Sequence, residues 1–174
     1  MELEKEIAST NFENNHHKTV VNVIYTYGWV TNLLRRCFDK HDITMQQFNI
    51  LRILRGQYPQ PATVSLLKER MLDKMSDASR IVDRLLQKEL ISRCTNLNDR
   101  RAVDITINTK GLSLLEILDQ EMNVNEILKS HISDEEADQL NVLLDKMRGG
   151  YNALLCRECL HSILSNTIFL LSIS

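Results

Sequence analysis

Residues that interrupt helices are scarce in this chain. Its 174 residues include five glycines and two prolines. Glycine and proline are the strongest local breaks in regular structure, so their scarcity favours long helices over a turn-rich β fold.

The chain also lacks long apolar runs. Its longest uncharged apolar stretch, Leu160 to Ser174, is too short and too rich in serine to span a bilayer. No apolar run follows a basic start, so we expect neither a secretory signal nor a membrane partner. The four cysteines, Cys37, Cys94, Cys156 and Cys159, are therefore expected as thiols in a cytoplasmic protein.

Motifs that would carry catalysis are missing as well. The sequence has no phosphate-binding loop, no H-E-x-x-H metal motif and no G-x-S-x-G nucleophile elbow. We therefore expect neither an enzymatic activity nor a cofactor.

Charge is distributed unevenly along the chain. The net charge is −2, with 43% apolar and 25% charged residues, as in an ordinary soluble domain. Between Gln60 and Gly111, ten lysines and arginines accompany seven acidic residues, so this stretch carries +3 and the rest −5. A basic middle between acidic flanks fits a DNA-contacting module on an acidic scaffold, although three charges alone are weak support.

Apolar spacing predicts helices in the first third of the chain. Side chains between Val20 and Phe38 recur every three or four residues, which predicts one long amphipathic helix. Thr44 and Gln47 form a capping box at the start of the next helix, which Gly56 ends.

Two shorter helices follow, and their order suggests a helix-turn-helix. Thr63 can cap a helix that runs through about Met71. After a connection of a few residues, Ser76 can cap a second helix that runs through about Glu89.

The residue pattern after Glu89 then changes from one typical of helices to one typical of strands. Ile91–Cys94 and Ala102–Asn108 are predicted strands joined by a polar hairpin tip. Thr109 caps a further helix, and a capping box of Ser133 and Glu136 begins a long terminal helix.

This order of elements predicts a mainly α fold with a small β-wing: a winged helix-turn-helix with long N- and C-terminal dimerisation helices. The expected organisation is a flexible segment at 1–15, an N-terminal dimerisation helix at 16–42, a winged helix-turn-helix domain at 43–110, C-terminal dimerisation helices at 111–157 and an apolar tail of unknown role at 158–174.

The physical logic of this arrangement favours DNA as the partner. A helix fits the major groove and presents its first turn to base edges, where Ser76, Ser79 and Arg80 lie. Arg100 and Arg101 at the hairpin tip can enter the minor groove, where the negative potential is deepest.

Simpler interpretations exist for each of these residues. Most arginines on amphipathic helices are solvated, and Arg84 and Lys88 later in the same helix are expected to be so. The paired arginines of the tip could form a surface network with Asp99. The rival function is a winged-helix module that binds protein without DNA; such a module has no need of Ser79, Arg80 and the arginine tip together.

Several segments resemble the MarR family of bacterial regulators, including Ile132–Glu136 and the residues through Leu144, which are similar to its last helix. Ser79-Arg80-Ile81-Val82-Asp83-Arg84-Leu85, followed by Leu90-Ile91-Ser92-Arg93, looks like its recognition helix and first wing strand. Asn98-Asp99-Arg100-Arg101-Ala102-Val103 and Thr109-Lys110-Gly111 resemble its wing and next helix start. The residues that we expect at the DNA are Lys74, Ser76, Asp77, Ser79, Arg80, Arg93, Asp99, Arg100 and Arg101.

The resemblance implies a function as well as a fold. It implies a homodimer that binds a double-stranded, pseudo-palindromic operator, represses more often than it activates, and is released by a small ligand, often phenolic, or by thiol oxidation. It also implies that Asp99 orients Arg101 or Arg100.

The chain departs from the family pattern at two places. The family usually has glycine between the recognition helix and the wing, where this chain has Glu89. A non-glycine residue with positive φ there would cost roughly 1 kcal/mol, unless the turn is built differently. The apolar tail after Leu155 has no family counterpart that we can identify, and we expect it to pack on the dimer or to be poorly structured.

Candidates for sensing a signal are weaker. Tyr25, Tyr27, Trp29 and His41 could line an effector pocket, although aromatic residues at helical spacing more often pack in a core.

Three cysteines could sense oxidants: Cys37, and the C-x-x-C pair of Cys156 and Cys159. The pair could equally be small apolar residues in helix packing, or half of a zinc site with His161.

Overall fold

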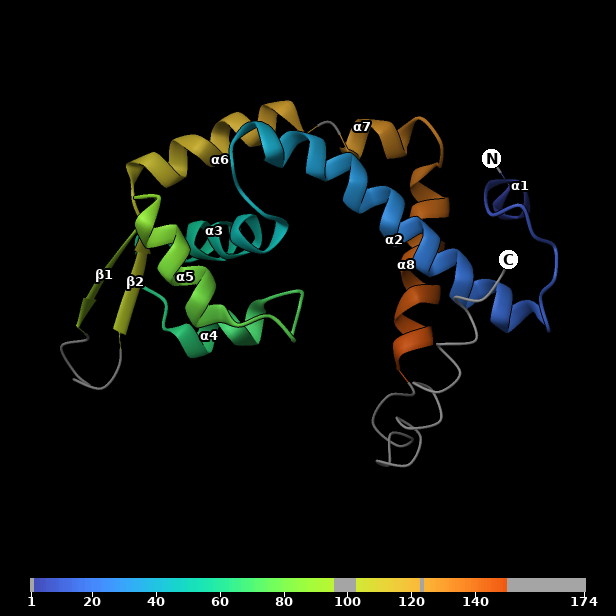
Figure 1. The fold of residues 1–174 in the computed structure, drawn as a ribbon, viewed down its shortest axis with the longest axis horizontal. Coiled ribbons are helices and arrows are strands. Elements are labelled where there is room, and N and C mark those ends of the chain that lie inside the picture. Colours follow the sequence, from blue (N-terminus) through green and yellow to red (C-terminus); the bar gives the residue numbers. More distant parts are fainter. Residues whose placement is uncertain (1, 96–102, 123, 150–174) are drawn as a thin grey trace. The chain divides into compact units, whose positions relative to one another are not determined.

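The computed structural model describes residues 2–95, 103–122 and 124–149, and Figure 1 shows their fold. The described residues are mainly helical, with one two-stranded antiparallel sheet, as the sequence predicts. The chain divides into two compact units, residues 1–124 and 125–174, and each is described by itself. Within the described ranges no helix is both long and apolar enough to cross a membrane.

The first unit begins with helix α1 (Leu3–Glu6) and the long helix α2 (Asn15–Lys40). The N-terminal segment, which we expected to be frayed, contains α1 and buries Leu3. Lys18 on α2 pairs with Glu4, and the side chain of Asn14 accepts a hydrogen bond from the backbone of His17 to cap α2.

Three helices then form the centre of the unit: α3 (Met45–Gln57), α4 (Val64–Arg70) and α5 (Ala78–Gln87). The capping box of Thr44 and Gln47 at α3 is confirmed, as is the cap that Thr63 supplies to α4. Helix α3 runs one residue past Gly56, where we expected it to end.

The wing is an antiparallel pair of strands, β1 (Ile91–Thr95) and β2 (Val103–Ile107). Both predicted strands are confirmed to within a residue. A third stretch, which the sequence does not reveal, completes the wing: Ala62 and Ile105 exchange two backbone hydrogen bonds of 2.9 Å each. The hairpin tip at 96–102 lies outside the described residues.

Helix α6 (Thr109–Glu121) closes the unit over α3. Its N-cap is Asn108, whose side chain accepts a hydrogen bond from Gly111 N, and not Thr109 as predicted. Two arginines of α3 form ion pairs with Asp119 of α6. The distances to its carboxylate are 2.8 Å from Arg52 and 2.6 Å from Arg55. The buried side chains beneath are apolar except for Gln47, and the largest include Ile50, Leu51, Leu54, Leu67, Leu85, Ile105, Leu115 and Leu118.

The turn between α5 and β1 is built at positive φ. Glu89 has φ of 57°, which confirms the conformation expected at the position where the family has glycine. Its carbonyl accepts a hydrogen bond from the side chain of Asn108, and its carboxylate lies 3.1 Å from Lys110 Nζ.

Replacement of Glu89 by glycine should therefore stabilise the protein by about 1 kcal/mol, because glycine adopts positive φ without strain. The substitution also removes the ion pair with Lys110, but this pair is exposed and contributes little to the stability of the fold. Glu89→Ala is the matched control, since it removes the same ion pair and keeps the strain. Urea denaturation should show a higher free energy of unfolding for the glycine variant alone. Equal free energies for the two variants would contradict the inference that Glu89 is strained.

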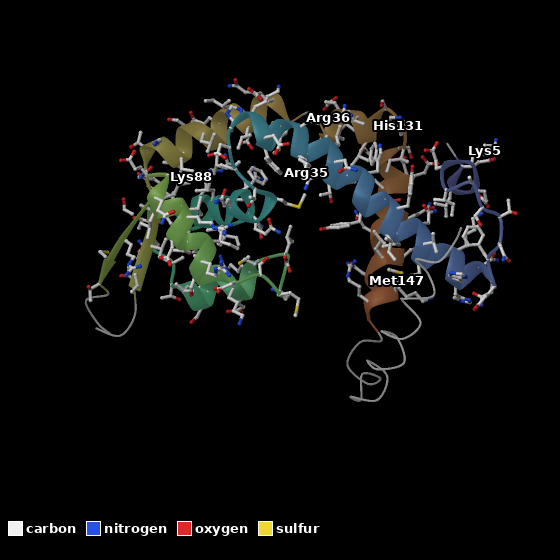
Figure 2. All side chains as sticks on the ribbon, in the orientation of Figure 1. Lys5, Arg35, Arg36, Lys88, His131 and Met147 are labelled. Carbon is white, nitrogen blue, oxygen red and sulfur yellow. The ribbon has the colours of Figure 1, made fainter. Side chains whose placement is uncertain are left out.

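Helix α7 (Val124–Lys129) begins at the boundary between the units, and the second unit contains the rest of it and α8 (Asp134–Arg148). The capping box of Ser133 and Glu136 is confirmed at the start of α8. Residues from 150 onward, including Cys156, Cys159 and the predicted apolar tail, lie outside the described residues. None of the described residues of α8 is buried, so its apolar side chains, including the labelled Met147 (Figure 2), are exposed or half-buried.

Candidate nucleic-acid interface

Helices α4 and α5, with the turn between them, form a helix-turn-helix beside the wing (Figure 1). Ala78, Val82 and Leu85 bury one face of α5 against the core. The opposite face is exposed, and its first turn lies at the end of α5 away from Lys88 (Figure 2). Residue spacing on a helix therefore leaves Ser79, Arg80, Asp83 and Arg84 on the outer side.

The cap of α5 differs from the predicted one. Asp77, and not Ser76, is the N-cap, and its carboxylate accepts a hydrogen bond of 3.2 Å from Arg80 N. Ser76 instead donates its hydroxyl to Asp73 Oδ2 at 2.5 Å. Ser76 therefore belongs to the turn, and its hydroxyl reaches DNA only if it leaves this carboxylate.

Asp73 organises that turn, and sequence reasoning missed it. Its Oδ1 accepts a hydrogen bond of 3.0 Å from Met75 N. The hydroxyl of Ser76, followed by that backbone N–H, lowers the pKa of Asp73, so the carboxylate stays ionised at neutral pH. The sequence did contain a pattern that indicates this role, because an Asp followed by a Ser three residues later is typical of side-chain capping within a turn.

Arg80 has the most suitable position for a DNA contact. It lies exposed in the first turn of α5, and within the described residues its guanidinium makes no hydrogen bond or ion pair. With Arg84, Thr44 and Gln46 it lines a shallow polar depression of about 290 Å³. A planar guanidinium with five donors suits the acceptor pair on guanine or a phosphate.

Two other predicted cations are already engaged. Lys74 donates to the backbone carbonyl of Glu69, and Arg93 on β1 lies 3.5 Å from Asp83 on α5. Both are exposed, and exposed pairs of this kind are weak, so either cation can exchange its partner for a phosphate. Asp99, Arg100 and Arg101, predicted at the wing tip, lie outside the described residues.

The predicted effector residues lie in different surroundings within the described part of the chain. Tyr25, Tyr27 and Trp29 are exposed along α2, and Tyr25 donates its hydroxyl to Glu6 at 2.8 Å, which raises the pKa of that phenol. His41 lies at the end of α2 in an open depression of about 600 Å³ beside Lys88 and Lys110. None of the three aromatic residues of α2 lines that depression.

Cys37 has surroundings that favour the neutral thiol. Burial, and then the hydrogen bond to Glu121 Oε2 at 3.7 Å, raise its pKa. His41 Nε2 lies 3.2 Å from the same carboxylate and is the main cause of the lowered pKa of Glu121. A thiol is less reactive toward oxidants than a thiolate, so these contacts oppose rapid oxidation of Cys37. In the described part of the chain no cluster of three potential ligands could hold a metal ion.

Comparison with known proteins agrees with this geometry. A sequence model of the MarR family matches residues 43–103, the segment that contains the helix-turn-helix and β1 and ends at the first residue of β2. The HTH-type transcriptional regulator MhqR of Bacillus subtilis (strain 168) is 27% identical over 129 residues, which cover 73% of this chain and 86% of MhqR. The HTH-type transcriptional repressor MdtR of the same organism is 36% identical over 73 residues, 42% of this chain and 46% of MdtR.

Solved structures give the same result. A mutant of MarR from E. coli, crystallised in complex with operator DNA, superposes with a TM-score of 0.63 at 25% identity. The match covers 84% of this chain and 99% of that one. The fold and the exposed first turn of α5 thus define a winged helix-turn-helix DNA-binding protein. Residues 43–103 of this chain match the MarR family, and the similar proteins named above are transcriptional regulators.

Proposed function

We propose that this chain is a bacterial repressor that binds a pseudo-palindromic operator as a homodimer and leaves it when a small ligand or an oxidant is present. It would act in the cytoplasm, where its operator lies. The observation that carries this proposal is Arg80, exposed on the first turn of α5 and without a partner in the described part of the chain. Its relative MdtR is named a repressor.

In this proposal α5 enters the major groove with its first turn toward the bases. Arg80 and Ser79 contact base edges, while Asp77 holds the end of the helix in shape. Lys74 and Arg93 neutralise phosphates, and the tip residues Asp99, Arg100 and Arg101 serve the minor groove. Ser76 completes the turn and adds a phosphate contact when its hydroxyl exchanges Asp73 for the phosphate.

Exposed apolar side chains support the homodimer. Val20, Ile24 and Tyr27 are exposed on α2 in the first unit, and Leu140, Leu143 and Met147 on α8 in the second. Helical surfaces with this much exposed apolar area are typical of association sites. A two-fold dimer would present two copies of α5, which matches an operator with two inverted half-sites about one helical turn apart.

Truncation of Leu140 to alanine is expected to weaken the dimer on the order of tenfold, since apolar side-chain area would no longer be buried between the copies. Gln139→Ala is the matched control, because Gln139 is an exposed polar neighbour on the same helix. Sedimentation velocity over a concentration series measures the dissociation constant. Equal dissociation constants for the two variants would remove α8 from the interface.

The signal that releases the protein is proposed to be a small ligand rather than an oxidant of Cys37, because the pKa of that thiol is raised. Oxidation of Cys156 and Cys159 remains the alternative signal for release. A phenolic compound, as the family resemblance suggests, could be bound near Tyr25, Tyr27 and Trp29 or, separately, near His41.

The decisive experiment selects DNA fragments of the source genome that the purified protein binds, and then titrates the bound complex with phenolic compounds and with peroxide. We expect an inverted repeat bound with strong salt dependence, and release by one of the compounds. Failure to bind any fragment, together with capture of a protein partner through the winged domain, would favour a protein-binding module instead.

A further inference from the structure

The turn before α5 carries two unusually exposed apolar side chains. Met75 is 94% exposed and Leu72 is 84% exposed, more than any other large apolar side chain among the described residues. Their neighbour Met71 is 1% exposed and belongs to the core. Met71 therefore anchors the turn in the core, while Leu72 and Met75 are exposed to solvent.

Hydrogen bonds to side chains fix the backbone of this turn. Leu72 N donates to Asn49 Oδ1 on α3 at 3.0 Å, and Met75 N donates to Asp73 Oδ1 at 3.0 Å. Asp73 also holds Ser76. Met75 is thus displayed from a braced turn, two residues before Asp77, the cap of α5.

We propose that Met75 is a specificity-determining residue that contacts the C5-methyl group of a thymine in each operator half-site. This rests on the proposed function, because it assumes that the first turn of α5 enters the major groove. The thymine methyl is the apolar group that base pairs display in that groove. A thioether side chain is flexible and polarisable, which suits contact with a small apolar target.

The neighbours of Met75 favour DNA over a protein surface as its occupant. Lys74 precedes Met75, and Ser79 and Arg80 follow in the first turn of α5. The carboxylates of Asp73 and Asp77 also lie here, but each accepts hydrogen bonds from the turn itself, which leaves Arg80 and Ser79 to face a partner. Leu72 and Met75 together offer less apolar area than a protein-binding patch usually has, and the guanidinium and hydroxyl beside them match phosphates and base edges around a methyl group.

Replacement of single thymines by deoxyuridine tests the contact, since uracil differs from thymine only by the absent methyl. Wild-type protein is titrated against the selected operator with one thymine of each half-site replaced in turn. At one thymine we expect affinity to fall about fourfold for each half-site, as for a methyl group that is no longer withdrawn from water.

Two variants assign that loss to Met75. Met75→Gln keeps the length of the side chain and removes its apolar end, so it should bind the thymine operator more weakly and be indifferent to uracil at the sensitive position. Met75→Leu should keep the preference for thymine. Thermal unfolding should be unchanged in both, because the side chain is exposed.

The results separate the possible failures. If wild-type protein binds no fragment before uracil is introduced, the proposed function itself fails. The inference about Met75 is overturned if Met75→Gln keeps the same sensitivity to uracil, or if no thymine matters to wild-type protein that binds tightly. A changed dimer dissociation constant with the uracil effect intact would assign Met75 to protein contact, which also overturns it.

Discussion

Replacement of Arg80 by alanine is expected to weaken operator binding by about 1–3 kcal/mol, or roughly fivefold to 150-fold, if its guanidinium reads a base. The side chain is exposed in the first turn of α5 and makes no ion pair within the described residues, so it can approach DNA without first breaking a contact there. Its backbone N–H is engaged by the cap Asp77, and alanine preserves that bond.

Arg84→Ala is the matched control for Arg80. Arg84 is also exposed and lines the same shallow depression, but it lies one helical turn later and is expected to be solvated. Fluorescence anisotropy should be measured at two salt concentrations with the operator and with an unrelated duplex. A base contact predicts a loss confined to the operator, whereas a phosphate contact weakens both duplexes and lowers the salt slope. Equal binding by the two variants would exclude Arg80 from the interface.

Replacement of Gly111 by alanine is expected to destabilise the fold by about 3 kcal/mol. A Cβ atom at this position would lie 2.2 Å from the backbone oxygen of Leu90 and 2.8 Å from a side-chain carbon of Ile107. Neither neighbour can yield easily, because Leu90 N is hydrogen-bonded to α5 and Ile107 is buried in β2. The first turn of α6 would have to move away from the wing.

Gly56→Ala gives the control for this prediction. Gly56 lies within α3, and nothing approaches its position within 4 Å, so alanine should stabilise the helix by about 0.5–1 kcal/mol. Urea denaturation followed by circular dichroism measures both changes. A loss at Gly111 below about 1 kcal/mol would mean that α6 and the wing adapt to the added atom.

Local signals explain which parts of the fold could be predicted from sequence. The capping boxes at Thr44 and Ser133 were predictable because both partners lie within four residues of each other. The starts of α5 and α6 were misassigned where two capping residues are adjacent. Asp77 caps α5 because Asp73 holds Ser76, and that competition is visible only in three dimensions.

Long-range contacts explain what could not be predicted. The pairing of Ala62 with Ile105 joins residues far apart in sequence, and a segment that contributes one residue to a sheet has no periodicity to detect. The effector site stays a prediction for a similar reason: helical spacing places Tyr25 and Trp29 on α2, but it does not say whether a pocket forms beside them.

The pairing of Ala62 with Ile105 also constrains how this protein can diverge. The loop between α3 and α4 has its own position in the wing, because both hydrogen bonds of Ala62 are made with β2. An insertion or deletion on either side of Ala62 would shift that register or displace Thr63 from its place at the start of α4. Length variation among descendants should therefore be tolerated poorly in this short loop, although most of its residues are exposed and would otherwise look free to change.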